Sequence, residues 1–134
     1  MKFVTVAEMV SIEKEADAKG HSYAKMMEHA GYELAKANLK SPLDSLDRNS
    51  GKGKELFEIY CISCHGAAGN GKGKLVEREK FLGVPSYKDR VITEGSIFHV
   101  ETYGLNSMGS HANQLSVHER WLVADYVLKL KSQL

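Results

Sequence analysis

The run Cys61-Ile62-Ser63-Cys64-His65 constrains this chain more than any other feature, because it holds both of the cysteines. One possible pair, three positions apart, cannot supply a disulfide framework that holds a fold together. The chain has 134 residues, of which 43% are hydrophobic and 26% charged, so it has enough apolar material for one packed domain. We therefore expect a fold stabilised by packing, with this motif as the candidate site of its chemistry.

Charge and hydropathy argue against two classes of function. Lys and Arg number 18 against 17 Asp and Glu, and this balance of +1 argues against nucleic-acid binding through a strong overall field. No run of about 18 apolar residues is present, so no transmembrane segment is predicted. Acidic side chains interrupt residues 1–20, so no signal peptide is recognised there.

Helical signals dominate the chain, and we predict an all-α fold. Residues 1–40 are expected to form a helical extension, in which a capping box at Thr5 begins one helix that runs to about Lys19. Ser22 can cap a second helix. Residues 41–50 are rich in turn-forming side chains and are expected to form a linker. The second unit is residues 51–134, with helices expected over 51–60, after Thr93 over 94–102, and from the Ser116 capping box onward.

The motif has the C-x-x-C-H pattern to which c-type haem is attached. Two thiols three positions apart at the end of a helix, Cys61 and Cys64, can form thioethers to the two vinyl groups along one porphyrin edge. The next residue, His65, then places its imidazole under the iron as an axial ligand. One covalent haem c would also supply much of the core of a domain of about 85 residues.

Two other chemistries use similar residues. A bare C-x-x-C is also a thioredoxin-like redox pair, although that pair usually belongs to a βαβ unit, which is not predicted here. A zinc site needs four ligands, and the motif leaves the fourth to a distant histidine without finger-like spacing. On the five residues of the motif alone, both alternatives stay open.

Residues 50–134 resemble a class I cytochrome c along their whole length. In that family a helix with a glycine and an aromatic leads into the motif, and here Gly53 and Phe57 precede Cys61 at four-residue steps. Tyr126 stands where the family's last helix carries an aromatic that packs across this first helix. The resemblance implies a class I cytochrome c fold wrapped around one covalent haem, in which the small Gly53 lets the two helices cross closely.

The same resemblance assigns two further residues. The family needs a methionine on a loop past the histidine, and Met108 is the only methionine after the motif. Met108 is therefore implied as the second axial ligand of the iron, with His111 as the alternative. Pro85 matches the family's proline after the haem loop, and its carbonyl is implied to accept the imidazole N–H of His65. A simple turn proline is an equally good interpretation of Pro85.

Residues 83–127 resemble more narrowly the monohaem cytochrome of the quinol-oxidising alternative complex III. The resemblance lies in the run from Gly83 to Leu115 and in the HERWLVADYV that begins at His118. It implies a position in the periplasm or on the outer face of a respiratory or photosynthetic membrane complex. It also implies redox partners, which are a quinol-oxidising membrane complex, a terminal oxidase or a soluble electron carrier.

Residues 1–40 resemble a different family, the opening helices of NAD(P)H-hydrate epimerase. In that family this stretch precedes an α/β domain with an N-G-G-D-G-type loop, and no such loop follows here. We therefore assign no epimerase activity and no catalytic residue. The two helices are interpreted either as a docking or dimerisation arm or as an inert extension.

These features predict an electron-transfer protein rather than an enzyme, because iron that keeps both axial ligands binds no substrate. The alternatives are a haem-based sensing or catalytic domain with a displaceable sixth ligand, and a zinc-binding or redox C-x-x-C interaction module. Lysines that flank the motif are interpreted either as a surface that steers an acidic partner, chiefly by raising the association rate, or as a solvated face without a partner. They are Lys52, Lys54, Lys72 and Lys74.

Overall fold

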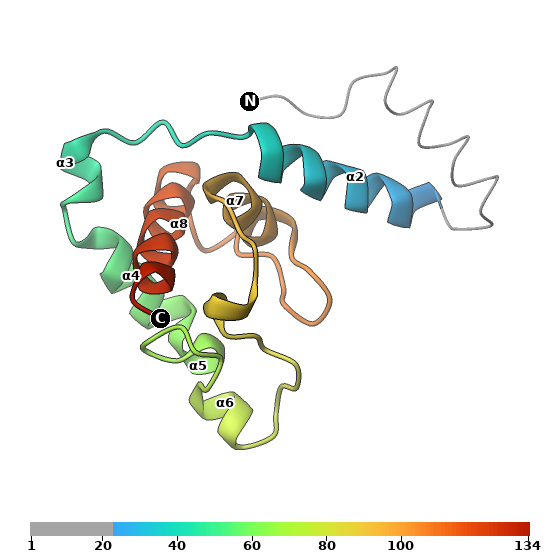
Figure 1. Ribbon diagram of the computed structural model, residues 1–134, viewed down its shortest axis with the longest axis vertical. Coiled ribbons are helices and arrows are strands. Elements are labelled where there is room, and N and C mark those ends of the chain that lie inside the picture. The colour runs from blue at the N-terminus through green and yellow to red at the C-terminus, as the bar shows by residue number, and fades with distance from the viewer. Residues whose placement is uncertain (1–22) are drawn as a thin grey trace.

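The computed structural model describes residues 23–134, and this part of the chain is all-α, as predicted (Figure 1). The predicted helix that ends near Lys19 lies outside the described residues. Within 23–134, backbone pairing between extended segments is confined to one isolated bridge, between Leu105 and Met108. No helix in this range is long and apolar enough to cross a membrane. The helices are α2 (Tyr23–Asn38), α3 (Ser45–Arg48), α4 (Lys52–Tyr60), α5 (Ile62–His65), α6 (Lys74–Glu77), the 3-10 helix η1 (Tyr87–Asp89), α7 (Glu94–Tyr103) and α8 (Val117–Ser132).

Side-chain caps begin α7 at Thr93 and α8 at Ser116, as predicted, and at both helices the cap is a full capping box. The Thr93 side chain accepts a hydrogen bond from the backbone N–H of Ser96, and the Ser96 hydroxyl accepts one from the N–H of Thr93. Ser116 and Glu119 make the same reciprocal pair at the start of α8, at 2.9 and 3.1 Å. Each box satisfies backbone donors that have no partner within the helix, so the start of each helix is fixed locally.

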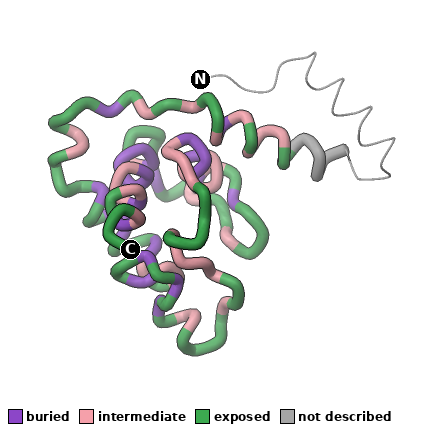
Figure 2. Tube along the Cα trace, in the orientation of Figure 1, coloured by how far each residue is buried: buried purple, intermediate pink, exposed green. Residues whose placement is uncertain are grey.

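Helix α4 crosses α8 at Gly53, and this crossing confirms the predicted contact between the two helices. A side chain at Gly53 would collide with the carbonyl of Leu122 and come within 3.2 Å of the Cβ of Tyr126. One turn further along α4, the rings of Phe57 and Tyr126 lie 5.4 Å apart. Figure 2 shows the buried positions concentrated on the facing sides of these helices and of α7. The largest fully buried side chain is Phe57.

Helix α7 packs against the other side of this core and is itself covered by α2 (Figure 1). The ring of Phe98 on α7 stacks on Trp121 of α8, with centroids 4.1 Å apart. On the opposite face, Gly95 lies so close to the carbonyls of Ala35 and Leu39 that no side chain would fit there. The Thr93 hydroxyl also donates to the Lys36 carbonyl, at 2.7 Å. The second helix of the predicted extension therefore packs on residues 51–134.

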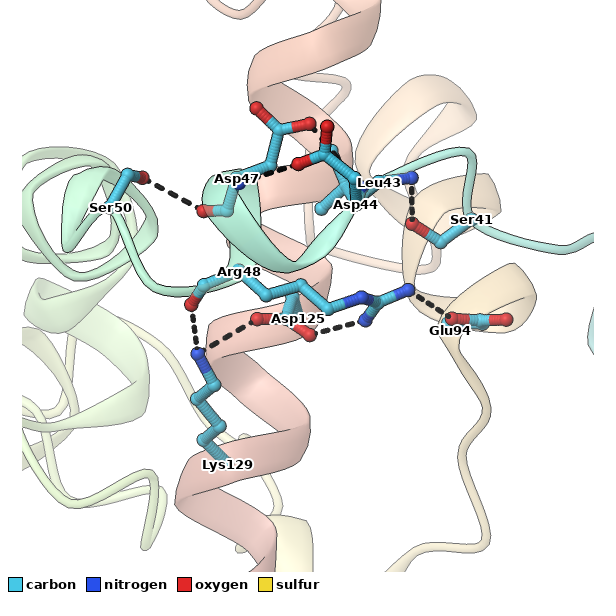
Figure 3. A network of polar contacts seen from close by, with 9 residues as sticks. All are labelled: Ser41, Leu43, Asp44, Asp47, Arg48, Ser50, Glu94, Asp125 and Lys129. Atoms are coloured by element: carbon cyan, nitrogen blue, oxygen red, sulfur yellow. Dashed lines mark hydrogen bonds and ion pairs between the residues drawn. The ribbon is translucent and has the colours of Figure 1, made fainter.

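The stretch predicted as a linker, residues 41–50, contains the one-turn helix α3 and is held to α7 and α8 by an ionic network (Figure 3). The Arg48 guanidinium pairs with Asp125 of α8 at 2.6 Å and reaches Glu94 of α7 at 3.8 Å. Lys129 pairs with Asp125 at 3.0 Å and donates a hydrogen bond to the Arg48 carbonyl. Leu43 is buried in the core. These contacts fix the segment that joins α2 to α4.

The helix crossing at Gly53 generates a stability prediction. In Gly53→Ala the added Cβ must push the α8 backbone away, and we expect the free energy of unfolding to fall by about 1–3 kcal/mol, as for other overpacked cores. Urea unfolding followed by circular dichroism measures this. Gly109→Ala is the matched control, because nothing lies within 4 Å of a Cβ built there. An equal effect of the two substitutions would contradict the crossing.

Candidate functional site

One turn of helix carries the whole motif. Cys61 ends α4, where its N–H donates to the Phe57 carbonyl at 2.9 Å, and it also begins α5. Its own carbonyl accepts hydrogen bonds from the N–H groups of Cys64, at 3.3 Å, and His65, at 3.0 Å. Residues spaced by three and four positions share one face of a helix, so both thiols and the imidazole lie on the same side. Cys61 is buried, and Cys64 and His65 are half-buried.

The glycine-rich loop after the motif folds back over α5. Gly71 donates to the His65 carbonyl at 2.9 Å, and Gly73 donates to the Cys64 carbonyl at 3.1 Å. A Cβ at Gly73 would collide with the backbone of Ser63, so glycine is required for this approach. The loop satisfies the last carbonyls of a helix of four residues, and it thereby fixes the helix that bears the motif.

Both thiols are free. Burial, together with the smaller effects of the nearby Glu101 and Cys64, raises the pKa of Cys61 to about 12. A thioredoxin-like pair depends on a thiol whose pKa is lowered, so that the thiolate can attack a disulfide. Cys61 has the opposite environment, which disfavours the redox-pair alternative.

The zinc alternative has no preformed site in the part of the chain that the structure describes. Among those residues, no group of three or more His, Cys, Asp and Glu side chains is arranged to hold a metal ion. Cys61, Cys64 and His65 are brought onto one helical turn, but no fourth ligand of these types joins them there. A tetrahedral structural site needs that fourth ligand.

The surroundings of His65 favour the neutral form of its imidazole. Its ring stacks on Tyr87, with centroids 5.0 Å apart and planes 18° from parallel. Burial lowers the pKa of His65, and His111 lowers it further. The Nδ1 atom is buried without a hydrogen-bond partner. A neutral imidazole can act as a ligand, whereas a protonated one cannot.

Pro85 lies beside the glycine-rich loop, where its carbonyl oxygen would come within 2.9 Å of a Cβ built at Gly71. Since Nδ1 of His65 has no partner, the predicted hydrogen bond to the Pro85 carbonyl is not formed in this structure. The role of Pro85 stays a prediction. Tyr87, two residues further along, was not expected from the sequence, and its ring stacks on the imidazole.

Met108 lies on a loop that is anchored to the end of α7. Leu105 and Met108 exchange two backbone hydrogen bonds of 2.9 Å around a tight turn, in which Asn106 has a φ of 53°. The Ser110 hydroxyl donates to the Thr102 carbonyl at 2.6 Å. Met108 itself is half-buried. His111, on the same loop, contributes to the lowered pKa of His65. The ligand role of Met108 stays a prediction.

Several buried polar side-chain atoms have no hydrogen-bond partner among the described residues, and such atoms are rare in folded proteins. Besides Nδ1 of His65, they include Nδ1 of His111, both carboxyl oxygens of Glu101 and Nε of Arg120. Glu101 and Arg120 were not expected from the sequence. A signal was present, since Arg120 occupies the first position of an apolar stripe with Val123, Ala124 and Val127, and Glu101 follows Phe98 by three positions.

This donor set fits a haem. The two free thiols and the imidazole share one helical face, and the imidazole Nδ1 is buried without a hydrogen-bond partner. Cys61 and Cys64 would hold the porphyrin by thioethers, and His65 would bind the iron.

The fold and this site together define a c-type cytochrome domain. The chain belongs to the family described as cytochrome c oxidase, cbb3-type, subunit III, whose model matches residues 49–127, which is more than half of its length. Membership implies a haem c cofactor and electron transfer. No curated protein matches the chain with significant similarity.

The different burial of the two thiols predicts different reactivity in the haem-free protein. Alkylation needs the thiolate, and Cys61, with its pKa raised to about 12, forms little thiolate at mildly alkaline pH. We expect iodoacetamide to modify Cys61 at least about tenfold more slowly than the half-buried Cys64, with the difference narrowing as the pH approaches the raised pKa. Peptide mass mapping measures both rates, and in denaturant they should be equal. Faster modification of Cys61 in the folded protein would contradict the environment described here.

Proposed function

We propose that residues 51–134 form an electron carrier that holds one haem c through Cys61 and Cys64, with His65 and Met108 as the two axial ligands. The observation that carries this proposal is the placement of both thiols and a neutral imidazole on one helical turn within a cytochrome c family domain. When bound, the haem supplies an iron that accepts and releases one electron. Its attachment to the chain is expected at the two sulfur atoms.

The surroundings of the two proposed ligands favour electron transfer over sensing or catalysis. The turn that bears His65 is tied by backbone hydrogen bonds to the glycine-rich loop, and the turn that bears Met108 is closed by its own pair and anchored on α7. Ligands on segments that hydrogen bonds hold in place move little. An electron carrier needs such a small structural change between its oxidised and reduced states. A sensing or catalytic domain would instead need a sixth ligand that is easily displaced.

Haem attachment is tested directly by mass. The protein produced in cells that carry a cytochrome c maturation system should gain the mass of one haem, and the band should stain for haem on a denaturing gel. In Cys61→Ala/Cys64→Ala the covalent mass should be lost while His65 is unchanged. Protein that keeps two unmodified thiols after such maturation would overturn the proposal.

The sixth ligand is tested by a pair of substitutions on one loop. In Met108→Ala we expect the sulfur-to-iron charge-transfer absorption of the oxidised protein to disappear and the reduction potential to fall, because a thioether stabilises the reduced iron. In His111→Ala both should be retained. The optical spectrum and a potentiometric titration measure them, and the opposite pattern would assign the ligand to His111.

We further propose that the redox partner belongs to a membrane respiratory complex on the outer side of the membrane. The resemblance of residues 83–127 to the alternative complex III cytochrome favours a quinol-oxidising complex, and the family description favours a terminal oxidase. Among the four flanking lysines, Lys52 and Lys54 pair with Glu55 and Glu58 on α4 at 3.6 and 3.9 Å. The exposed Lys72 and Lys74 therefore remain the better candidates for steering an acidic partner.

The packing of α2 bears on the two interpretations of residues 1–40. Ala35 is buried, and Gly95 of α7 lies against its carbonyl, so this part of α2 is already covered within the chain. A docking or dimerisation arm would have to use another face. We propose that the described part of the extension supports α7.

A further inference from the structure

Tyr87 is an aromatic residue to which the proposed function gives no role, and it lies directly against the proposed iron ligand His65. The two rings stack with centroids 5.0 Å apart and planes 18° from parallel. Offset parallel rings at such a separation attract each other and favour one mutual orientation over others. The Tyr87 ring therefore restricts how the imidazole of His65 can turn.

Backbone contacts hold Tyr87 in place from two segments of the chain. Its N–H donates to the Gly69 carbonyl in the glycine-rich loop at 3.0 Å, and its own carbonyl accepts a hydrogen bond from the Lys131 ammonium group of α8 at 3.0 Å. The same ammonium group donates to the carbonyl of Arg90, the residue that follows η1, at 2.8 Å. Helix α8 therefore holds η1 at both ends, so the ring beside the imidazole is carried by a fixed segment.

The ring of Tyr87 is also held by packing. A Cβ built at Gly69 would approach Cδ2 of Tyr87 to 2.5 Å and Cε2 to 2.9 Å, so the ring fills the space that a side chain at this position would need. The side chain of Tyr87 packs against the cluster of buried core residues as well. The stacked ring is thus enclosed by the glycine-rich loop and the core.

The second ring nitrogen of a metal-bound histidine usually donates a hydrogen bond that orients the ring. In this structure Nδ1 of His65 is buried and has no hydrogen-bond partner among the described residues. Stacking on Tyr87 supplies an orienting contact that does not depend on such a hydrogen bond.

We propose that Tyr87 is a positioning residue, whose ring fixes the plane of the His65 imidazole when that imidazole binds the haem iron. This inference rests on the proposed function, because it requires a haem held at Cys61, Cys64 and His65. The plane of an axial imidazole selects the iron d orbital that interacts with the imidazole π system. In oxidised, low-spin iron this selection influences how the unpaired electron is spread over the porphyrin. The orientation of His65 is therefore measurable in the magnetic spectra of the oxidised protein.

The test compares oxidised holoproteins by proton NMR, which resolves the haem methyl resonances, and by electron paramagnetic resonance, which gives the principal g values. Loss of a stacked pair weakens the preference for one ring orientation by about two- to tenfold. In Tyr87→Leu, which keeps an apolar side chain but removes the aromatic face, the spread of the methyl resonances and the g values should therefore change. In Tyr87→Phe, which keeps the stacked ring, both should match those of the parent protein.

A pair of glycine substitutions tests the placement of the ring without removing it. The added Cβ of Gly69→Ala should displace the Tyr87 ring and so reproduce the spectral change of Tyr87→Leu. Gly83→Ala is the matched control, because Gly83 has nearly the same positive φ, 76° against 74°, and nothing lies within 4 Å of a Cβ built there. The spectra of Gly83→Ala should match those of the parent protein. This pair decides the question if Tyr87→Leu fails to assemble.

A further variant separates positioning from a general loss of stability. The ring of Tyr126 packs on Phe57 at the helix crossing, so in Tyr126→Leu the free energy of unfolding should fall while the haem spectra stay parental. Parental spectra in Tyr87→Leu or in Gly69→Ala would overturn the inference while leaving the carrier function intact. A change of the same size in Gly83→Ala or in Tyr126→Leu would overturn it as well. A protein without covalently attached haem would instead overturn the proposed function.

Discussion

The close crossing of α4 and α8 at Gly53 is the contact on which the rest of the structure depends. Because this glycine has no side chain, the Leu122 carbonyl lies against it, and Phe57 can meet Tyr126 one turn later. The same helix ends at Cys61, so the crossing fixes the place and direction in which the motif leaves the core. Helix α8 also carries Trp121, whose ring stacks on Phe98, and this contact positions α7 against α8.

Features that are encoded over a few residues could be predicted from the sequence. The caps at Thr93 and Ser116 begin α7 and α8 as expected, because a capping side chain acts on donors only two or three residues away. The one-turn helices α3 and α6 could not be predicted, since four residues are too few to show a helical period. The pair between Arg48 and Asp125 joins residues 77 positions apart, and no local pattern predicts such a contact.

The candidate site also contains residues that local spacing predicts and residues that only the packing of distant segments reveals. The motif from Cys61 to His65 was recognisable because its spacing alone places the reactive atoms on one face of a helix. Glu101 and Arg120 were missed because their burial arises only when α7 packs on α8. A charge within an apolar stripe is the signal to look for, since such a side chain either reaches solvent or meets a buried partner. Neither Oε of Glu101 nor Nε of Arg120 has a partner among the described protein atoms.

The N-terminal extension bears on this site through α7. The Thr93 hydroxyl caps α7 and at the same time donates to the Lys36 carbonyl of α2, so the start of α7 and the docking of α2 share one side chain. Gly95 then lets α2 approach the backbone of α7 directly. Helix α7 is therefore held between α2 on one face and α8 on the other, with Glu101 buried and the Met108 loop anchored at its end. Whatever the origin of residues 1–40, the contacts of α2 act on the helix that carries the buried carboxyl group.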